Sequence, residues 1–65
     1  GQDYWVAKDY ILLADILIAQ QDYFNAIALL EGMVKELKFD DLKQEAESKL
    51  SEAKALDKKS SKLSN

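Results

Sequence analysis

Apolar residues recur at spacings of three and four along three stretches of this 65-residue chain, a period that is typical of α-helices. We expect helices over residues 3–20, 22–38 and 41–56, followed by a polar tail over residues 57–65 that we expect to be disordered. The chain has no proline and only two glycines, so little interrupts helix formation. The sequence therefore predicts an all-α fold, an antiparallel helical hairpin with a third helix beside it.

The first stretch is apolar on nearly all sides. A broad stripe holds Val6, Ala7, Tyr10, Leu13, Ala14 and Leu17, a second group holds Trp5, Leu12 and Ile16, and a third holds Tyr4, Ile11 and Ile18 beside Lys8 and Asp15. A helix with such narrow polar seams is normally buried on several sides. Because only two other helices are available to cover it, we expect part of its apolar surface to stay open.

The second stretch has one clear apolar face. Asp22 precedes it and is expected to act as the N-cap, since its carboxylate can accept a hydrogen bond from an unpaired backbone amide. The face consists of Tyr23, Ala26, Ile27, Leu30, Met33, Val34 and Leu37. Gly32 lies inside this helix, where glycine costs about 1 kcal/mol relative to alanine. Either Gly32 is a tolerated surface residue, or another backbone approaches it closely.

The third stretch is polar over most of its surface. Asp40 or Asp41 can cap it, and Gln44 can complete an arrangement similar to a capping box. Its apolar stripe is thin and holds Leu42, Ala46, Leu50 and Ala53. We therefore expect this helix to cover a surface on one side and to face water on the other.

Composition argues against several functions. Histidine and cysteine are absent, which removes the commonest general base and metal ligand and all thiol chemistry, so we expect no catalysis, cofactor or metal. The net charge of −3 argues against a nucleic-acid partner. The longest apolar run, Tyr10 to Ala14, is far shorter than the ~20 residues that cross a membrane. The start also lacks the basic segment of a signal peptide, and the composition fits cytoplasm and periplasm alike.

Large, small and aromatic residues follow one another at set offsets along the hairpin. In chain order they are Tyr10, Leu13, Ala14, Leu17, the turn Gln21–Asp22–Tyr23, Ala26, Leu30 and Met33. Over residues 7–40 this pattern resembles the tetratricopeptide repeat, a helical unit of about 34 residues. Gln21 replaces the family's usual glycine, and Lys38 stands where proline often ends the unit. An ordinary helical hairpin is the alternative.

The resemblance implies which residues pack the hairpin together. They are Tyr10, Leu13, Ala14, Leu17, Tyr23, Ala26 and Leu30. The third helix extends the resemblance to residues 7–56, because Ala46, Leu50, Ser51 and Ala53 are similar to the first helix of a further repeat whose outer positions have become polar. Repeat arrays need such a cap for solubility. The resemblance thus implies the C-terminal repeat and capping helix of a longer bacterial protein.

Two interaction surfaces follow from that expectation. Trp5, Leu12 and Ile16 would contact the preceding repeat or a second copy of this chain. Such arrays also line a groove with the first helix of each pair, and carried onto this chain the groove residues are Lys8, Ile11, Asp15, Ile18 and Ala19. That groove would suit an apolar or amphipathic helix with a basic contact for Asp15. In the alternative, Ile11 and Ile18 are simply covered by the third helix or by neighbouring repeats.

The sequence therefore favours a non-catalytic scaffold for protein–protein interaction, the terminal module of a repeat array with protein, peptide or upstream repeats as partners. The alternative is a self-contained three-helix domain that forms homo-oligomers. Further units of about 34 residues upstream of Asp3 would support the array, whereas a natural start at this point would support the oligomer.

Overall fold

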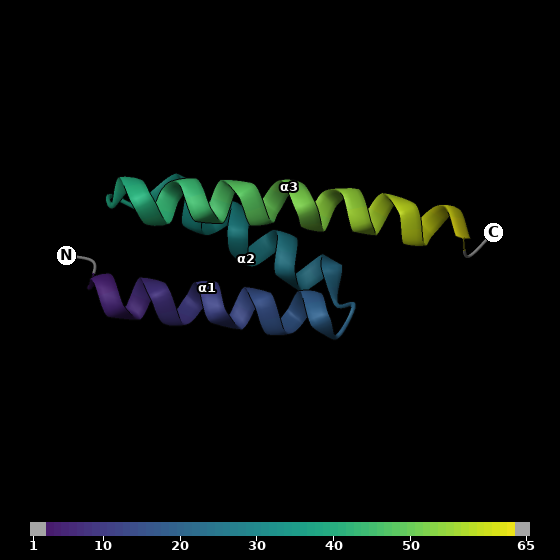
Figure 1. The fold of residues 1–65 in the computed structure, drawn as a ribbon, viewed down its shortest axis with the longest axis horizontal. Coiled ribbons are helices and arrows are strands. Elements are labelled where there is room, and N and C mark those ends of the chain that lie inside the picture. The colour runs from purple at the N-terminus through teal and green to yellow at the C-terminus, as the bar shows by residue number, and fades with distance from the viewer. Residues whose placement is uncertain (1–2, 64–65) are drawn as a thin grey trace.

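Three helices follow one another along the part of the chain that the structure, a computed structural model, describes, residues 3–63. They are α1 (Tyr4–Ala19), α2 (Tyr23–Glu36) and α3 (Asp40–Leu63). α1 and α3 run in the same direction, and α2 runs in the opposite direction to both (Figure 1). The predicted all-α fold, a helical hairpin with a third helix packed on it, is confirmed.

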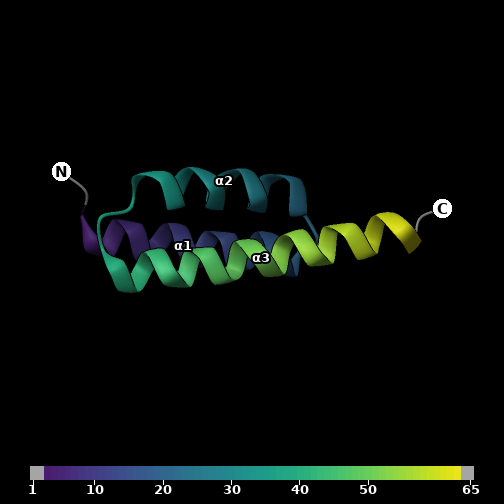
Figure 2. The same ribbon diagram turned by 90° about the horizontal axis from the view of Figure 1, so that it is seen from above.

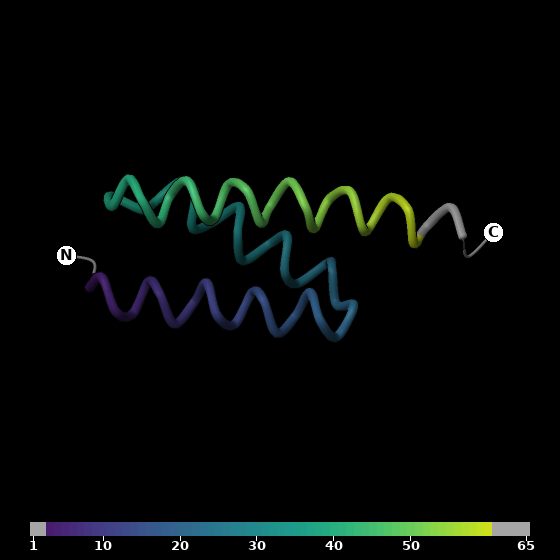
Figure 3. Tube along the Cα trace, in the orientation of Figure 1, coloured from purple at the N-terminus to yellow at the C-terminus, as the bar shows by residue number. Residues whose placement is uncertain are grey.

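The molecule is elongated, measuring 44 × 16 × 14 Å along its principal axes. Seen from above, α3 projects well beyond the end of the hairpin that carries the α1–α2 turn (Figure 2). The Cα trace in Figure 3 shows the same overhang at the C-terminal side. α3 therefore packs against the hairpin over its N-terminal part, and the overhang has no helix beside it.

α1 begins and ends for local reasons. The Asp3 carboxylate accepts a hydrogen bond from the Trp5 amide at 2.8 Å, which satisfies one of the unpaired amides of the first turn. At the other end Gln21 adopts a left-handed backbone with φ of 63°, and the Asp22 amide donates back to the Leu17 carbonyl at 2.8 Å. A side chain at positive φ is strained, which explains why glycine suits this position.

Asp22 caps α2, as the sequence predicted. Its carboxylate accepts from the Asn25 side-chain amide at 2.8 Å and, at 3.4 Å, from the Asn25 backbone amide. The helix stops at Glu36, two residues before the predicted end, where Leu37 turns to extended backbone and donates to the Met33 carbonyl at 2.8 Å. The chain thereby reverses direction for α3.

The expectation of a disordered tail from residue 57 is wrong up to Leu63, because α3 continues to that residue. The sequence after Gly32 contains neither glycine nor proline, and each further residue of an existing helix adds one hydrogen bond. A polar composition therefore kept this segment out of the core without stopping the helix. Residues 64 and 65 lie outside the described range.

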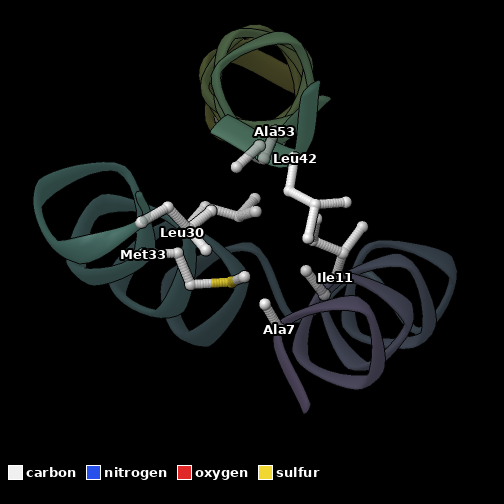
Figure 4. Close-up of a cluster of buried hydrophobic side chains, with 9 residues drawn as sticks. Ala7, Ile11, Leu30, Met33, Leu42 and Ala53 are labelled. Atoms are coloured by element: carbon white, nitrogen blue, oxygen red, sulfur yellow. The ribbon is translucent and has the colours of Figure 1, made fainter. Parts of the chain in front are cut away.

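The core is a single seam where the three helices face one another. Its buried members are Ala7, Ile11, Ala14, Ala26, Leu30, Met33, Leu37, Leu42, Ala46 and Ala53. Looking along the helices, side chains from all three point to a common centre (Figure 4). Half of these residues are alanines, and small side chains let helices approach closely. The core is correspondingly thin for a chain of this size.

The predicted packing side of α1 needs correction. Tyr10 is 48% exposed and Leu13 is 42% exposed, so neither is a buried hairpin contact, whereas Ile11 is 3% exposed and lies in the core. The reason is geometric: α1 contacts α3 as well as α2, so its buried stripe turns towards α3. The remaining predicted hairpin contacts are buried or half-buried. Ala14, Ala26 and Leu30 are fully buried, and Leu17 and Tyr23 are half-buried.

Candidate interaction surface

The outer face of α1 carries a concentration of exposed apolar side chains. It consists of Trp5 (69% exposed), Leu12 (58%), Tyr10 (48%), Val6 (47%), Ile16 (46%) and Leu13 (42%). Among the described side chains, the remaining exposed large apolar residue is Phe24 at the start of α2. Contiguous exposed apolar patches on soluble proteins often belong to interaction sites, which makes this face a candidate.

Helical spacing divides this outer face into two flanks. Trp5, Leu12 and Ile16 lie at intervals of seven and four residues and form one flank. Val6, Tyr10 and Leu13 lie at intervals of four and three on the side of α1 nearer α2. The predicted contact residues Trp5, Leu12 and Ile16 are therefore all exposed. Their role as a contact with a repeat or with a second copy stays a prediction.

The flank nearer α2 opens into a cleft of about 550 Å³ between α1 and α2. Its lining residues are Asp3, Val6, Ala7, Tyr10, Ala28, Leu29, Gly32, Met33, Glu36 and Leu37. No residue of α3 contributes, so the cleft lies on the side of the hairpin that α3 leaves uncovered. A Cβ atom built on Gly32 meets nothing within 4 Å. Within this chain, therefore, no backbone approaches Gly32 closely, and Gly32 is an exposed residue of α2.

α3 has the opposite character on its solvent side. No large apolar residue of α3 is exposed among its described side chains, which extend to Ser60. Its inward residues Leu42, Ala46 and Ala53 are completely or almost completely buried against the hairpin. One side of the hairpin is thus closed by a helix that water can surround, and the other side is open and apolar.

The predicted groove lies where α3 packs, and only part of it is open. Lys8, Ile11 and Asp15 border a shallow hollow of about 330 Å³ between α1 and α3, together with Glu45 of α3. Ile18 is half-buried and Ala19 is exposed outside this hollow. Ile11 borders this hollow but is only 3% exposed, because it belongs to the core that α3 covers. The alternative, coverage by the third helix, describes Ile11 correctly.

Asp15 contacts α3 directly. The Lys49 ammonium donates a hydrogen bond to the Asp15 carboxylate at 2.7 Å and lies 3.9 Å from the carboxylate of Glu45, one turn earlier in α3. The hydrogen bond to Asp15 is the main reason that the pKa of Lys49 is raised. Sequence spacing could not show the Asp15–Lys49 pair, since the two residues lie 34 positions apart. Asp15 is therefore already engaged by a cation of its own chain.

Two further contacts hold α3 on the hairpin. The Tyr4 hydroxyl donates to the Asp41 carboxylate at 2.6 Å, and this hydrogen bond raises the pKa of Tyr4 and lowers that of Asp41. Lys54 lies 3.4 Å from Glu31 of α2. The Tyr4 ring also packs edge-on against Phe39, with ring centroids 5.1 Å apart. α3 is thus tied to α1 at two points and to α2 at one.

Neither a metal centre nor a membrane span is found in the described range. No group of three or more histidine, cysteine, aspartate or glutamate side chains there could hold a metal ion. Of the helices described, none is long and apolar enough to cross a membrane.

Comparison with known proteins gives no match. No family model, no curated protein and no solved structure matches this chain.

Proposed function

We propose that this chain is a non-catalytic protein-interaction module, the capped end of a tetratricopeptide-like stack of helices. α3 closes one side of the hairpin, and the flank of α1 that carries Trp5, Leu12 and Ile16 receives the next helical element. The observation that supports this is the contrast between six exposed large apolar side chains on α1 and none on the described part of α3. A terminal unit needs one apolar side for its neighbour and one polar side for water.

The size of the apolar surface favours a neighbour within the same chain. Covering a half-exposed leucine or isoleucine contributes roughly 1 kcal/mol and covering Trp5 about twice that, so two such flanks gain about 8 kcal/mol together. Joining two separate molecules costs about 4–15 kcal/mol, which leaves little for a dimer. A covalently linked neighbour avoids most of that cost, since its effective concentration is high.

Trp5 fluorescence tests this proposal, because Trp5 is the chain's one tryptophan and it is 69% exposed. We compare this chain with a longer protein that includes the sequence preceding Asp3. Stacking predicts that the emission of Trp5 moves to shorter wavelength in the longer protein and that acrylamide quenches it less. Equal quenching in both proteins would refute stacking on this face.

Homo-oligomerisation is the second candidate, favoured by the same exposed face of α1. Sedimentation of the isolated chain separates the two, and stacking predicts a monomer at about 10–100 μM because the net gain of a dimer is small. A tight dimer that Leu12→Glu dissociates would establish the second candidate instead. Phe24→Glu is the matched control, since it removes an exposed apolar side chain outside the face.

A further inference from the structure

The α1–α2 cleft has the dimensions of a helix-binding site. Along α1 it extends from Asp3 to Tyr10, which at 1.5 Å per residue is about 10 Å, or two helical turns. Helices that bind in grooves use apolar anchors at positions i, i+3 or i+4, and i+7, which span the same length. Gly32 adds an open wall where a second helix can approach α2 closely.

The lining favours a helix over an extended peptide. The walls belong to α1 and α2, whose backbone amides and carbonyls are paired within each helix except in the terminal turns. An extended peptide would place its own backbone groups against apolar side chains such as Val6, Leu29 and Met33, and unpaired buried backbone groups are costly. A helix satisfies its own backbone and presents only side chains.

The negative charge at one end of the cleft indicates the charge of the helix that would bind there. Asp3 lies at the start of α1 and Glu36 at the end of α2, and because these helices are antiparallel both carboxylates lie at the same end. No lysine lines the cleft. A basic side chain on the bound helix would therefore meet two negative charges there, which gives the interaction a direction.

This chain does not supply such a helix itself. Six of its nine lysines are in α3, whose described side chains leave no large apolar residue exposed. α1 has the exposed apolar residues but contains Lys8 as its sole basic residue. α2 forms one wall of the cleft. Among the described side chains, no helix of a second copy combines an exposed apolar face with a basic end.

We propose that the α1–α2 cleft binds one helix of a partner protein, apolar along one face and basic at one end. This rests on the proposed role in protein interaction and names the kind of partner. The cleft lies on the flank of Val6 and Tyr10, so Trp5, Leu12 and Ile16 remain available for stacking while it is occupied.

Two synthetic helical peptides test the proposal by NMR titration of the labelled chain. Both carry leucines at i, i+4 and i+7, and they differ only in two terminal residues, lysine in one and glutamate in the other. We expect amide shifts at the cleft residues and an affinity about fivefold higher for the lysine peptide at low salt. That preference should shrink as salt increases. Equal affinity, or no shift with about 1 mM peptide, overturns the proposal.

Two pairs of variants locate the bound helix. Gly32→Gln fills the open wall and should weaken binding of the lysine peptide at least tenfold, whereas Gly32→Ala should change it less than twofold. Both variants should melt at a higher temperature than the parent because both improve helix propensity, so lost binding cannot reflect unfolding. Glu36→Lys should abolish the preference between the peptides, because the new positive charge offsets that of Asp3. Glu47→Lys on exposed α3 makes the same change in net charge and should preserve it.

The outcomes separate this proposal from the proposed function. Shifts confined to Trp5, Leu12 and Ile16 would overturn cleft binding and leave stacking intact. Equal binding by Gly32→Gln and Gly32→Ala would likewise exclude the cleft. Self-association of the chain that Gly32→Gln abolishes would make a second copy the occupant and overturn the proposal. The quenching of Trp5 decides the stacking proposal independently of all three results.

Discussion

α1 and α3 are built alike where they face the core and oppositely where they face water. Each contributes small and aliphatic residues to the seam, Ala7, Ile11 and Ala14 from α1 and Leu42, Ala46 and Ala53 from α3. On the outside, α1 carries six exposed large apolar side chains, while the described part of α3 carries none. The core explains why three helices hold together. The difference outside is that α1 exposes apolar side chains to water where the described part of α3 exposes polar ones.

The largest expected effect comes from comparing the same substitution, leucine to alanine, in the core and on the outer face of α1. Leu30→Ala in the fully buried core should cost about 2–5 kcal/mol, because it removes apolar contacts and leaves a cavity. Leu12→Ala on the outer face should change the free energy of unfolding by less than about 0.5 kcal/mol, since Leu12 is 58% exposed. Urea unfolding followed by circular dichroism measures both. Equal losses would show that Leu12 packs within the isolated chain.

A substitution in the α1–α2 turn serves as a control, because it changes stability without altering the outer face of α1 or of α3. Gln21 has a φ of 63°, a backbone region that glycine occupies without steric cost. Gln21→Gly should therefore stabilise the chain by up to about 1 kcal/mol, a gain limited by the extra freedom of glycine in the unfolded state. Its melting temperature should rise while binding and association stay unchanged. A fall in melting temperature would contradict the left-handed turn.

The ion pair between the two contrasted helices can be broken without touching the core. Lys49→Met should cost roughly 0.5–1 kcal/mol, because Lys49 is only partly buried and bonds Asp15 of α1. The raised pKa of Lys49 means that its contribution is complete below the ordinary lysine value of 10.5 and is lost as pH rises through the folded pKa. Lys58→Met on the exposed part of α3 is the control. Equal effects of the two variants would mean that the pair adds nothing.

The Tyr4–Asp41 bond should have the smallest effect and a distinctive pH dependence. The raised pKa of Tyr4 gives stability that is present below 10.0 and lost as pH rises through the folded value. The lowered pKa of Asp41 gives stability that is present above 3.8 and lost as pH falls through the folded value. Tyr4→Phe should thus lower the melting temperature slightly near neutral pH and less at either extreme. A loss that does not vary with pH would point to packing of the ring instead.

Some of the site could be predicted from sequence and some could not. The excess of apolar residues on α1 follows from the sequence alone, and Trp5, Leu12 and Ile16 are exposed in the structure. The cleft was missed, although Gly32 was a signal for it. Its two walls come from separate helices, and Asp3 and Glu36 meet only because those helices are antiparallel.

The sequence by itself determined the three helices, the Asp22 cap and the polar character of α3, because helical period and capping depend on residues a few positions apart. The tertiary structure decided which side of α1 is buried. α1 has apolar residues on three sides, so spacing alone leaves its rotation undetermined, and contact with α2 and α3 together turned Ile11 inward and Tyr10 and Leu13 outward. The continuation of α3 to Leu63 has a local cause instead, since a helix without a breaker extends past the last residue that packs.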